Sequence, residues 1–410
     1  MKNFIKKCLG VAALTVALNF AQAGVQASDC FDDCNPCDDA SICNPCDDLI
    51  DCGKKTQRLI SFWIEGGVTR NQFGRRDFYD DGLVPGNAYV LQNAKQTELV
   101  VNQLWISGER KVSRRGFDIG GRMDFVFGTD AKYLQSDGFE LKSRDAEGYN
   151  AFNNGDYGGA FAQAYGEIGY NRLNIKIGKM LSTLETEFDS VEAPHRNFYS
   201  WSYTHAVKPH TMTGIVADYK LSNRLTAFGG WTTGFDQSFY NEKDNAVVGG
   251  VKANLGKVHV LYSAALGRDK ANENGKYEYI VQTLAASAKL SKKLTYNFDW
   301  TLRNDKVDGA YLGAYGINQE LIYKLNAKWS VGARVEWMHV YDFPFAHSEE
   351  LVNGDFTALT FGATWTPAKW LLVRPEIRYD SISGGELTPF GKEIDKRYQT
   401  SYGISAVAKF

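Results

Sequence analysis

The sequence predicts an all-β fold, a transmembrane antiparallel up-and-down β-barrel of about 16 strands with a short Cys-rich N-terminal extension. Three observations lead to this prediction. Polar and apolar residues alternate with a period of two along most of the chain after residue 58. Charged residues occupy polar positions in the middle of these segments, and short connections alternate with long ones.

The N-terminus has the pattern of a secretory signal peptide. The opening MKNFIKK contains three lysines and no acid, an apolar run spans residues 8–20, and small residues at cleavage-site spacing end at Ala23 and Ala27. Residues 1–27 are therefore predicted to be a cleaved signal peptide. The alternative is an uncleaved membrane anchor, for which the apolar run is short and interrupted by polar residues.

Residues 28–58 form a Cys- and Asp-rich segment that is predicted to lie in the periplasm. Its cysteines are even in number and follow an export signal, so disulfide bonds are the expected state. Cross-links between chains are one alternative. A metal site is the other, with zinc on cysteines or calcium on the aspartates. The disulfide candidates are Cys30, Cys34, Cys37, Cys43, Cys46 and Cys52, of which the second to fifth are the candidate zinc ligands.

Residues 59–410 contain the alternating segments. In Leu294–Arg303 every even-numbered residue is apolar or aromatic and every odd-numbered residue is polar, as in a β-strand with one apolar face. Pro375 fits least, because proline lacks the N–H that a strand ladder needs, and it predicts a bulge or a place near a rim. Roughly fourteen or eighteen strands are the alternatives to sixteen, since predicted boundaries carry errors of about 2–4 residues. The predicted strands are 59–69, 97–108, 115–127, 160–170, 173–180, 211–220, 224–234, 246–255, 257–267, 278–290, 293–303, 312–325, 328–341, 354–366, 369–380 and 399–410.

The polar face of these segments carries charges where a soluble sandwich would have its core. Segments of about ten residues suit strands that cross a bilayer at a tilt. An apolar exterior and a charged interior fit lipid outside and water inside. The predicted pore-lining residues are Arg122, Asp124, Asp299, Arg303, Arg334, Glu336, Arg374, Glu376 and Arg378.

The predicted architecture implies a function. A barrel of roughly sixteen strands is too wide for side chains to fill, so it leaves an aqueous channel through the outer membrane for small hydrophilic solutes. The alternative is a structural barrel, surrounded by the same outer-membrane lipid, that anchors the envelope through its Cys-rich segment or loops. The sequence shows no catalytic or cofactor motif, so no enzyme and no cofactor are predicted. A net charge of −2 gives no sign of a nucleic-acid partner.

Residues 176–219 carry more than periodicity. They contain Gly-Lys at 178–179, Thr and Glu residues at 183–187, an Asp-x-x-x-Ala-Pro element at 189–194, the run NFYSWSY at 197–203 and Pro-x-Thr-x-Thr-Gly at 209–214. This segment resembles the putative β-barrel porins of beta-barrel porin family two. RPEIRYD, PFG and the final Phe410 are similar to the closing hairpin of that family. The chain departs from the family at Ser182, Leu184 and Thr186, where the family usually has Pro and Gly-Tyr. The resemblance implies an outer-membrane porin and does not give a substrate.

The connection 181–210 is the predicted pore constriction, because it is long and mixes acids with aromatic residues that gain by packing against a wall. We expect it to fold inward, opposite a basic strip of Arg334, Arg374 and Arg378 that faces water. The alternatives are a loop that caps the mouth or contacts a neighbouring subunit, and arginines that pair with wall glutamates. The candidate constriction residues are Glu185, Glu187, Asp189, Glu192, His195 and Arg196.

No metal site is predicted in the barrel, because the six histidines do not form the close pairs typical of metal motifs. The alternative is a site that joins His195, His205 or His210 to the acids of the same connection. A homotrimer is expected only by analogy with other sixteen-stranded porins.

Overall fold

The computed structural model describes residues 60–73, 87, 98–113, 116–141, 153–154, 156–238, 245–270, 276–307, 309–343, 351–386, 388–390 and 395–410. The chain divides into two units, Met1–Gln57 and Arg58–Phe410, and every described residue belongs to the second. The predicted signal peptide, the Cys-rich segment and all six disulfide candidates therefore lie outside the described residues.

The described chain is almost entirely β-structure. The strands are β1 (Ile60–Asn71), β2 (Val100–Arg110), β3 (Phe117–Gly128), β4 (Asn153–Asn154), β5 (Tyr157–Tyr170), β6 (Leu173–Leu181), β7 (Thr211–Lys220), β8 (Leu225–Phe235), β9 (Asn245–Asn254), β10 (Val258–Lys270), β11 (Lys276–Lys289), β12 (Leu294–Val307), β13 (Ala310–Lys324), β14 (Trp329–Phe343), β15 (Val352–Ala368), β16 (Leu371–Ser383) and β17 (Tyr398–Lys409). Two short helical segments, η1 (Asp130–Leu134) and α2 (Tyr203–Ala206), interrupt this pattern. Among the described residues, no helix is long and apolar enough to span a bilayer.

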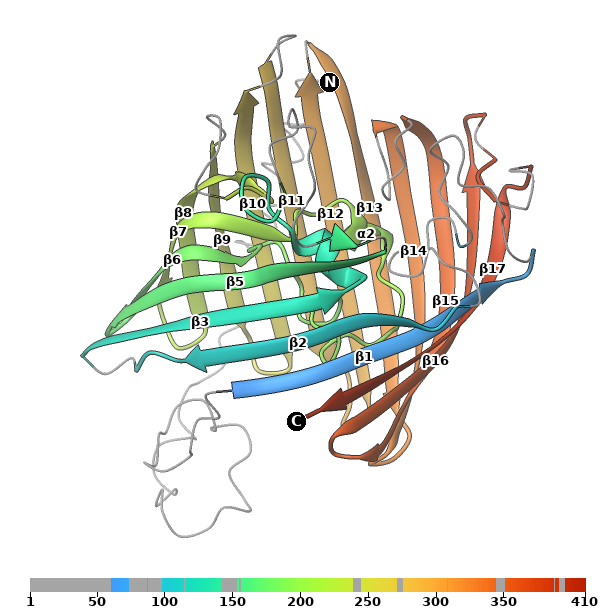
Figure 1. The fold of residues 1–410 in the computed structure, drawn as a ribbon, viewed down its shortest axis with the longest axis horizontal. Coiled ribbons are helices and arrows are strands. Elements are labelled where there is room, and N and C mark those ends of the chain that lie inside the picture. The colour runs from blue at the N-terminus through green and yellow to red at the C-terminus, as the bar shows by residue number, and fades with distance from the viewer. Residues whose placement is uncertain are drawn as a thin grey trace, which may run out of the picture. The chain divides into compact units, whose positions relative to one another are not determined.

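The sheet closes on itself. Each long strand pairs antiparallel with its neighbour, and β1 pairs with both β2 and β17, so that Trp63 lies opposite Trp105 on one side and Lys409 on the other (Figure 1). The 17 strands include the two-residue β4, which only adds to the edge of β5. The wall is thus a closed barrel of sixteen strands, which confirms the predicted fold class. Closure gives every strand of the wall a paired neighbour on both sides, as lipid requires.

The largest boundary differences lie at the ends of the tall hairpins. β12 runs to Val307, although residue 303 was the predicted limit, and β14 runs to Phe343, although residue 341 was the predicted limit. Paired strands continue past the bilayer as long as their ladder remains, whereas hydrophobic alternation marks only the part that faces lipid.

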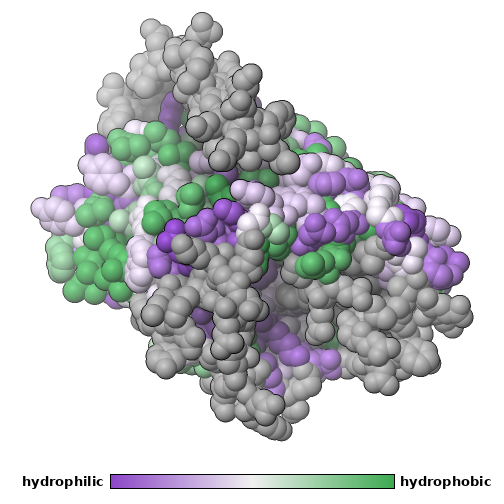
Figure 2. Space-filling model, turned by 90° about the horizontal axis from the view of Figure 1, so that it is seen from above, coloured by the Kyte–Doolittle hydropathy of each residue, from purple (hydrophilic) through white to green (hydrophobic). Residues whose placement is uncertain are grey.

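The two faces of the wall differ as the alternation predicts. On β12, Asn297, Asp299 and Thr301 point inward and are buried. Large apolar side chains such as Ile119 and Leu266 are more than half exposed on the outer face. Seen from above, hydrophobic residues gather at the left margin and hydrophilic residues lie across the middle (Figure 2). The interior is therefore polar and the exterior apolar.

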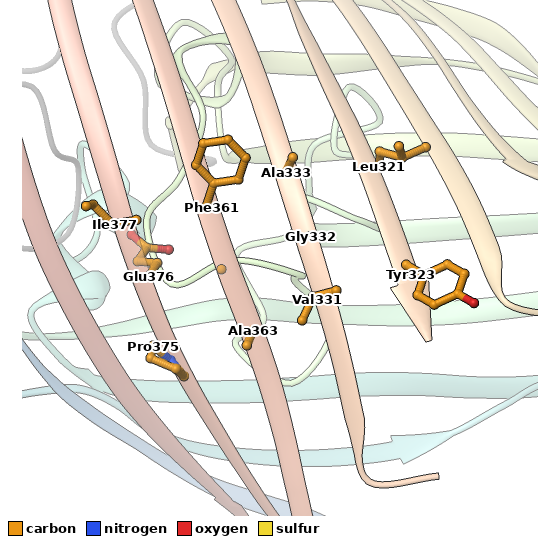
Figure 3. Close-up of a pocket in the computed structure, with 11 residues that line it drawn as sticks. Leu321, Tyr323, Val331, Gly332, Ala333, Phe361, Ala363, Pro375, Glu376 and Ile377 are labelled. Carbon is orange, nitrogen blue, oxygen red and sulfur yellow. The ribbon is translucent and has the colours of Figure 1, made fainter. Parts of the chain in front are cut away.

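Pro375 lies where one ladder is interrupted. Pairing between β15 and β16 runs to Gly362 and Glu376 and resumes at Trp365 and Val373, while pairing of Pro375 with Ile404 on β17 continues. A missing N–H explains the gap on the β15 side. The same place lies beside a largely apolar depression of about 620 Å³, whose lining includes Leu321, Tyr323, Phe361 and Ile377, with Glu376 at its edge (Figure 3). Since the apolar and aromatic side chains here belong to the lipid-facing set, this depression is not part of the interior.

Candidate functional site

The connection between β6 and β7, residues 182–210, is named here the inner loop. Its two ends are held together, since the Ser182 N–H donates to the His210 carbonyl at 2.9 Å. Between them the chain reaches the far wall, and α2 packs against β12, β13 and β14 (Figure 1). Its partners there are inward-facing side chains, so the inner loop lies within the barrel.

The central turn of the inner loop is bound to β14 and β16. Glu376 accepts hydrogen bonds from the backbone N–H groups of Tyr199 at 2.8 Å and Ser200 at 3.1 Å. Arg334 donates to the Ser200 carbonyl at 2.7 Å and to its hydroxyl at 2.9 Å. Charged wall groups thus satisfy backbone groups that a loop inside a barrel would otherwise leave unpaired.

The start of α2 is held by a second charged group. Glu336 accepts from the Tyr203 N–H at 2.6 Å and lies 2.8 Å from guanidinium nitrogens of both Arg334 and Arg378. The Tyr203 hydroxyl donates to Asp380 at 2.5 Å, and Arg378 lies 2.8 Å from the same carboxylate. One buried carboxylate therefore joins two wall cations to the loop backbone.

A third group fixes the inner loop to β1. Glu65 pairs with Arg196 of the loop and, at 2.5 Å, with Arg374 of β16. Arg374 also donates to the carbonyls of Ala193 at 2.9 Å and Arg196 at 3.0 Å. The next loop acid, Glu192, pairs with Arg122 on β3. The inner loop is thus tied to walls on both sides of the closing seam.

Glycines in the wall make room for two loop aromatic rings. A Cβ on Gly332 or Gly362 would lie 3.0 Å from the Phe198 ring, and a Cβ on Gly403 would lie 3.2 Å from the Tyr199 ring. Arg334 covers the outer face of Phe198, with its guanidinium 4.9 Å from the ring centroid. Close approach to the wall is what fixes these rings.

The expected basic strip facing water is wrong. Arg334, Arg374 and Arg378 point into the barrel, but each is at most 2% exposed. The loop carbonyls and wall carboxylates surround them. Asp124, Asp299 and Glu336 are equally buried, whereas Arg303 is partly exposed and pairs with Asp305 at 3.0 Å. Because the inner loop covers this half of the wall, the charged wall residues hold the inner loop in place.

The candidate constriction residues divide into two groups. Glu187 and His195 are exposed, and Glu185 is partly exposed. Asp189, Glu192 and Arg196 are buried against the wall or the loop itself. Burial alone would raise the pKa of Glu192, but His195 at 3.0 Å and Arg122 together lower it. These last contacts keep the Glu192 carboxylate charged.

A cavity of about 610 Å³, lined by charged and aromatic side chains, lies beside Glu192 and His195, at the end of the barrel where the short turns and the C-terminus meet. Cationic side chains outnumber acidic ones in its lining. The lining includes Ser61, Phe62, Trp63, Ser107, Glu109, Lys111, Arg122, Pro194, Lys369, Trp370, Lys409 and Phe410.

A cluster at the base of the inner loop contains two of the three histidines that the sequence offered as an alternative metal site. Three atoms that could bind a metal ion, one each from Glu185, His205 and His210, lie within 4.8 Å of one another. His195 is elsewhere, paired with Glu192. Burial raises the pKa of Glu185 and lowers the pKa of His205 well below its usual value, with neighbouring His210 and the cations of Lys208 and Arg196 acting in the same direction. His205 is therefore neutral at pH 7.

The depressed pKa predicts that acid destabilises the protein. The unfolded chain binds a proton at His205 more readily than the folded chain, so the free energy of unfolding should fall as pH decreases from about 7 to about 5. Guanidinium unfolding in detergent, with a metal chelator present, measures this slope. His205→Gln should lose part of it and His259→Gln, at an exposed wall position, should keep it. An unchanged slope in His205→Gln would contradict the prediction.

Together, a closed barrel with a polar interior, an apolar exterior and a loop bound inside it define an outer-membrane channel protein. The model of the putative beta-barrel porin-2, OmpL-like family matches residues 60–410, and the chain belongs to this family. It is a porin of the outer membrane. No curated protein sequence matches the chain significantly.

Solved barrels have the same fold at low sequence identity. The trimer form of OmpT, an outer membrane protein of Vibrio cholerae, has a TM-score of 0.55 at 12% identity, covering 86% of this chain and 98% of that one. The anion-selective porin from Comamonas acidovorans has a TM-score of 0.57 at 10% identity, covering 86% of this chain and 98% of that one. The outer membrane channel DcaP of Acinetobacter baumannii has a TM-score of 0.54 at 12% identity, covering 86% of this chain and 96% of that one.

Proposed function

We propose that this porin passes small hydrophilic solutes by passive diffusion and that the inner loop forms its constriction. The observation that carries the proposal is the binding of the inner loop to β1, β14 and β16 through buried charges. A loop fixed in this way narrows a wide barrel without closing its polar ends. Exposed Glu187 and His195 are then the loop charges that solutes meet.

The proposed ion preference is weakly anionic. The cavity of about 610 Å³ is lined by four cationic side chains, Lys111, Arg122, Lys369 and Lys409, and by two acids, Glu109 and Glu192. An excess of positive charge in a water-filled passage concentrates anions. The anion-selective porin among the similar structures has the same fold, which is compatible with this preference.

Other features of the whole protein remain proposals. We propose no catalytic activity and no cofactor, a homotrimer surrounded by outer-membrane lipid, and a cleaved signal peptide. The trimer form of OmpT supports the oligomer by its fold alone. The Cys-rich segment 28–58 is proposed to be a periplasmic appendage cross-linked by disulfides. Its oxidising compartment and even cysteine number support this.

Conductance in a planar bilayer tests the proposed function. The purified protein should give unitary steps, and a KCl gradient should give a reversal potential on the anion-selective side. Replacing Lys111 and Lys409 together by Gln should move that potential towards zero, whereas Lys292→Gln with Lys293→Gln, in a turn at the same end, should leave it nearly unchanged. Silence from a correctly folded barrel would favour the structural alternative.

A further inference from the structure

The cluster of Glu185, His205 and His210 joins the two ends of the inner loop. Glu185 follows shortly after β6, and His210 comes immediately before β7. The two imidazole rings lie 4.7 Å apart between centroids, with 30° between their planes. Both also contact the ring of Trp201, at 4.4 Å and 5.5 Å. Three potential ligands are thus gathered under an aromatic cover.

The hydrogen bonding of His205 leaves one ring nitrogen free. Its Nδ1 lies 2.9 Å from the Asp189 carbonyl, which can only accept, so the proton is on Nδ1 and a lone pair is on Nε2. Nε2 is fully buried and has no hydrogen-bond partner within the described part of the chain. A buried polar atom without a partner requires a reason. Metal-bound histidines show this arrangement, with the remote N–H held by a carbonyl.

The carboxylate of Glu185 also has one oxygen that lacks a hydrogen-bond partner among the described residues. Its Oε1 is 3.3 Å from His210 Nδ1, while its Oε2 is buried and has no partner among the described residues. Two residues of the same small cluster, from opposite ends of one loop, therefore each have a buried polar atom without a partner among the described residues. Hydrogen bonds within the cluster do not account for them.

We propose that Glu185, His205 and His210 bind one zinc ion. Two imidazoles and one carboxylate are a ligand set that zinc uses, with water in the fourth position. Magnesium and calcium prefer oxygen ligands, of which this cluster offers only one side chain. The bound ion would clamp the base of the inner loop. The binding itself does not depend on whether the barrel conducts.

Metal content of the full-length protein in detergent tests the site. Wild-type protein stripped with chelator and dialysed against ZnCl₂ should retain one more zinc ion per chain than the His205→Gln variant. The zinc affinity of this site should be about 100-fold lower in the variant. His259→Gln should bind like the wild type. MgCl₂ in place of ZnCl₂ should give no retention. Equal zinc content in the wild type and a folded His205→Gln would overturn the proposal.

X-ray absorption at the zinc edge separates this site from zinc on the N-terminal cysteines and needs no variant. Nitrogen and oxygen neighbours at about 2.0–2.1 Å are expected for His and Glu ligands, whereas thiolates add sulfur at about 2.3 Å. A shell of sulfur alone in the zinc-loaded wild type would place the ion elsewhere and refute the site. This readout also decides the matter if His205→Gln fails to fold.

Discussion

Replacing residues 184–208 by Asn-Gly should raise the unitary conductance of the porin about threefold or more. The excision removes the part of the chain that lies inside the barrel. It leaves Ser182 and His210, whose backbone hydrogen bond already closes the hairpin of β6 and β7 at 2.9 Å. Thr183, the inserted Asn-Gly and Pro209 then form a four-residue connection, a length that β-hairpins use. Single-channel recording in a planar bilayer measures the change.

Two controls make this experiment decisive. Glu187→Gln keeps the inner loop and removes only an exposed charge, so it should shift ion selectivity with little change in conductance. A heat-modifiable band on a gel shows whether the shortened barrel is folded. If the folded excision variant conducts like the wild type, the inner loop is not the narrowest part of the passage.

The barrel itself was predictable because its solvent imposes a simple rule on each strand. In β12, polar Asn297 and Asp299 alternate with aromatic Phe298 and Trp300. Lipid on one side of the strand and a polar interior on the other require this alternation. Turn lengths were readable for the same reason, since Asn171 and Arg172 stand alone between two alternating runs.

The burial of interior charges was not predictable, because it depends on contacts between residues distant in sequence. Arg374 lies 309 positions from its partner Glu65. The alternation of polar and apolar residues predicts that the Arg374 side chain points inward, but it does not predict which residues pack against that side chain. An arginine facing water and an arginine under a docked loop have the same local sequence pattern, so the predicted basic strip failed.

The histidine cluster was only an alternative in the sequence analysis, for a related reason. His205 and His210 are separated by the end of α2 and the turn before β7, so no regular spacing brings them together. Their meeting with Glu185 follows from the closure of the loop base. The acid and histidine content of 185–210 was the available signal, and it did not distinguish His195 from the other two.

Glu336→Leu should destabilise the folded porin by about 3–5 kcal/mol. Its carboxylate compensates Arg334 and Arg378, both at 2.8 Å, and accepts the Tyr203 N–H at 2.6 Å. With the carboxylate gone, Arg378 keeps its pair with Asp380, Arg334 loses its carboxylate partner, and the N–H of Tyr203 loses the Glu336 acceptor. Guanidinium unfolding in detergent measures the loss, and single-channel noise should rise as α2 loosens.

A matched variant separates burial from charge. Glu278 pairs with Arg268 at 3.1 Å on the wall, but both side chains are largely exposed, so Glu278→Leu should cost only about 0–1 kcal/mol. Replacing Glu336 by Leu and Arg334 by Met together should recover part of the loss, because the cation that pairs with Glu336 is removed with its partner. Equal effects of Glu336→Leu and Glu278→Leu would show that solvent reaches Glu336, and that the inner loop is not held to β14 by a buried charge.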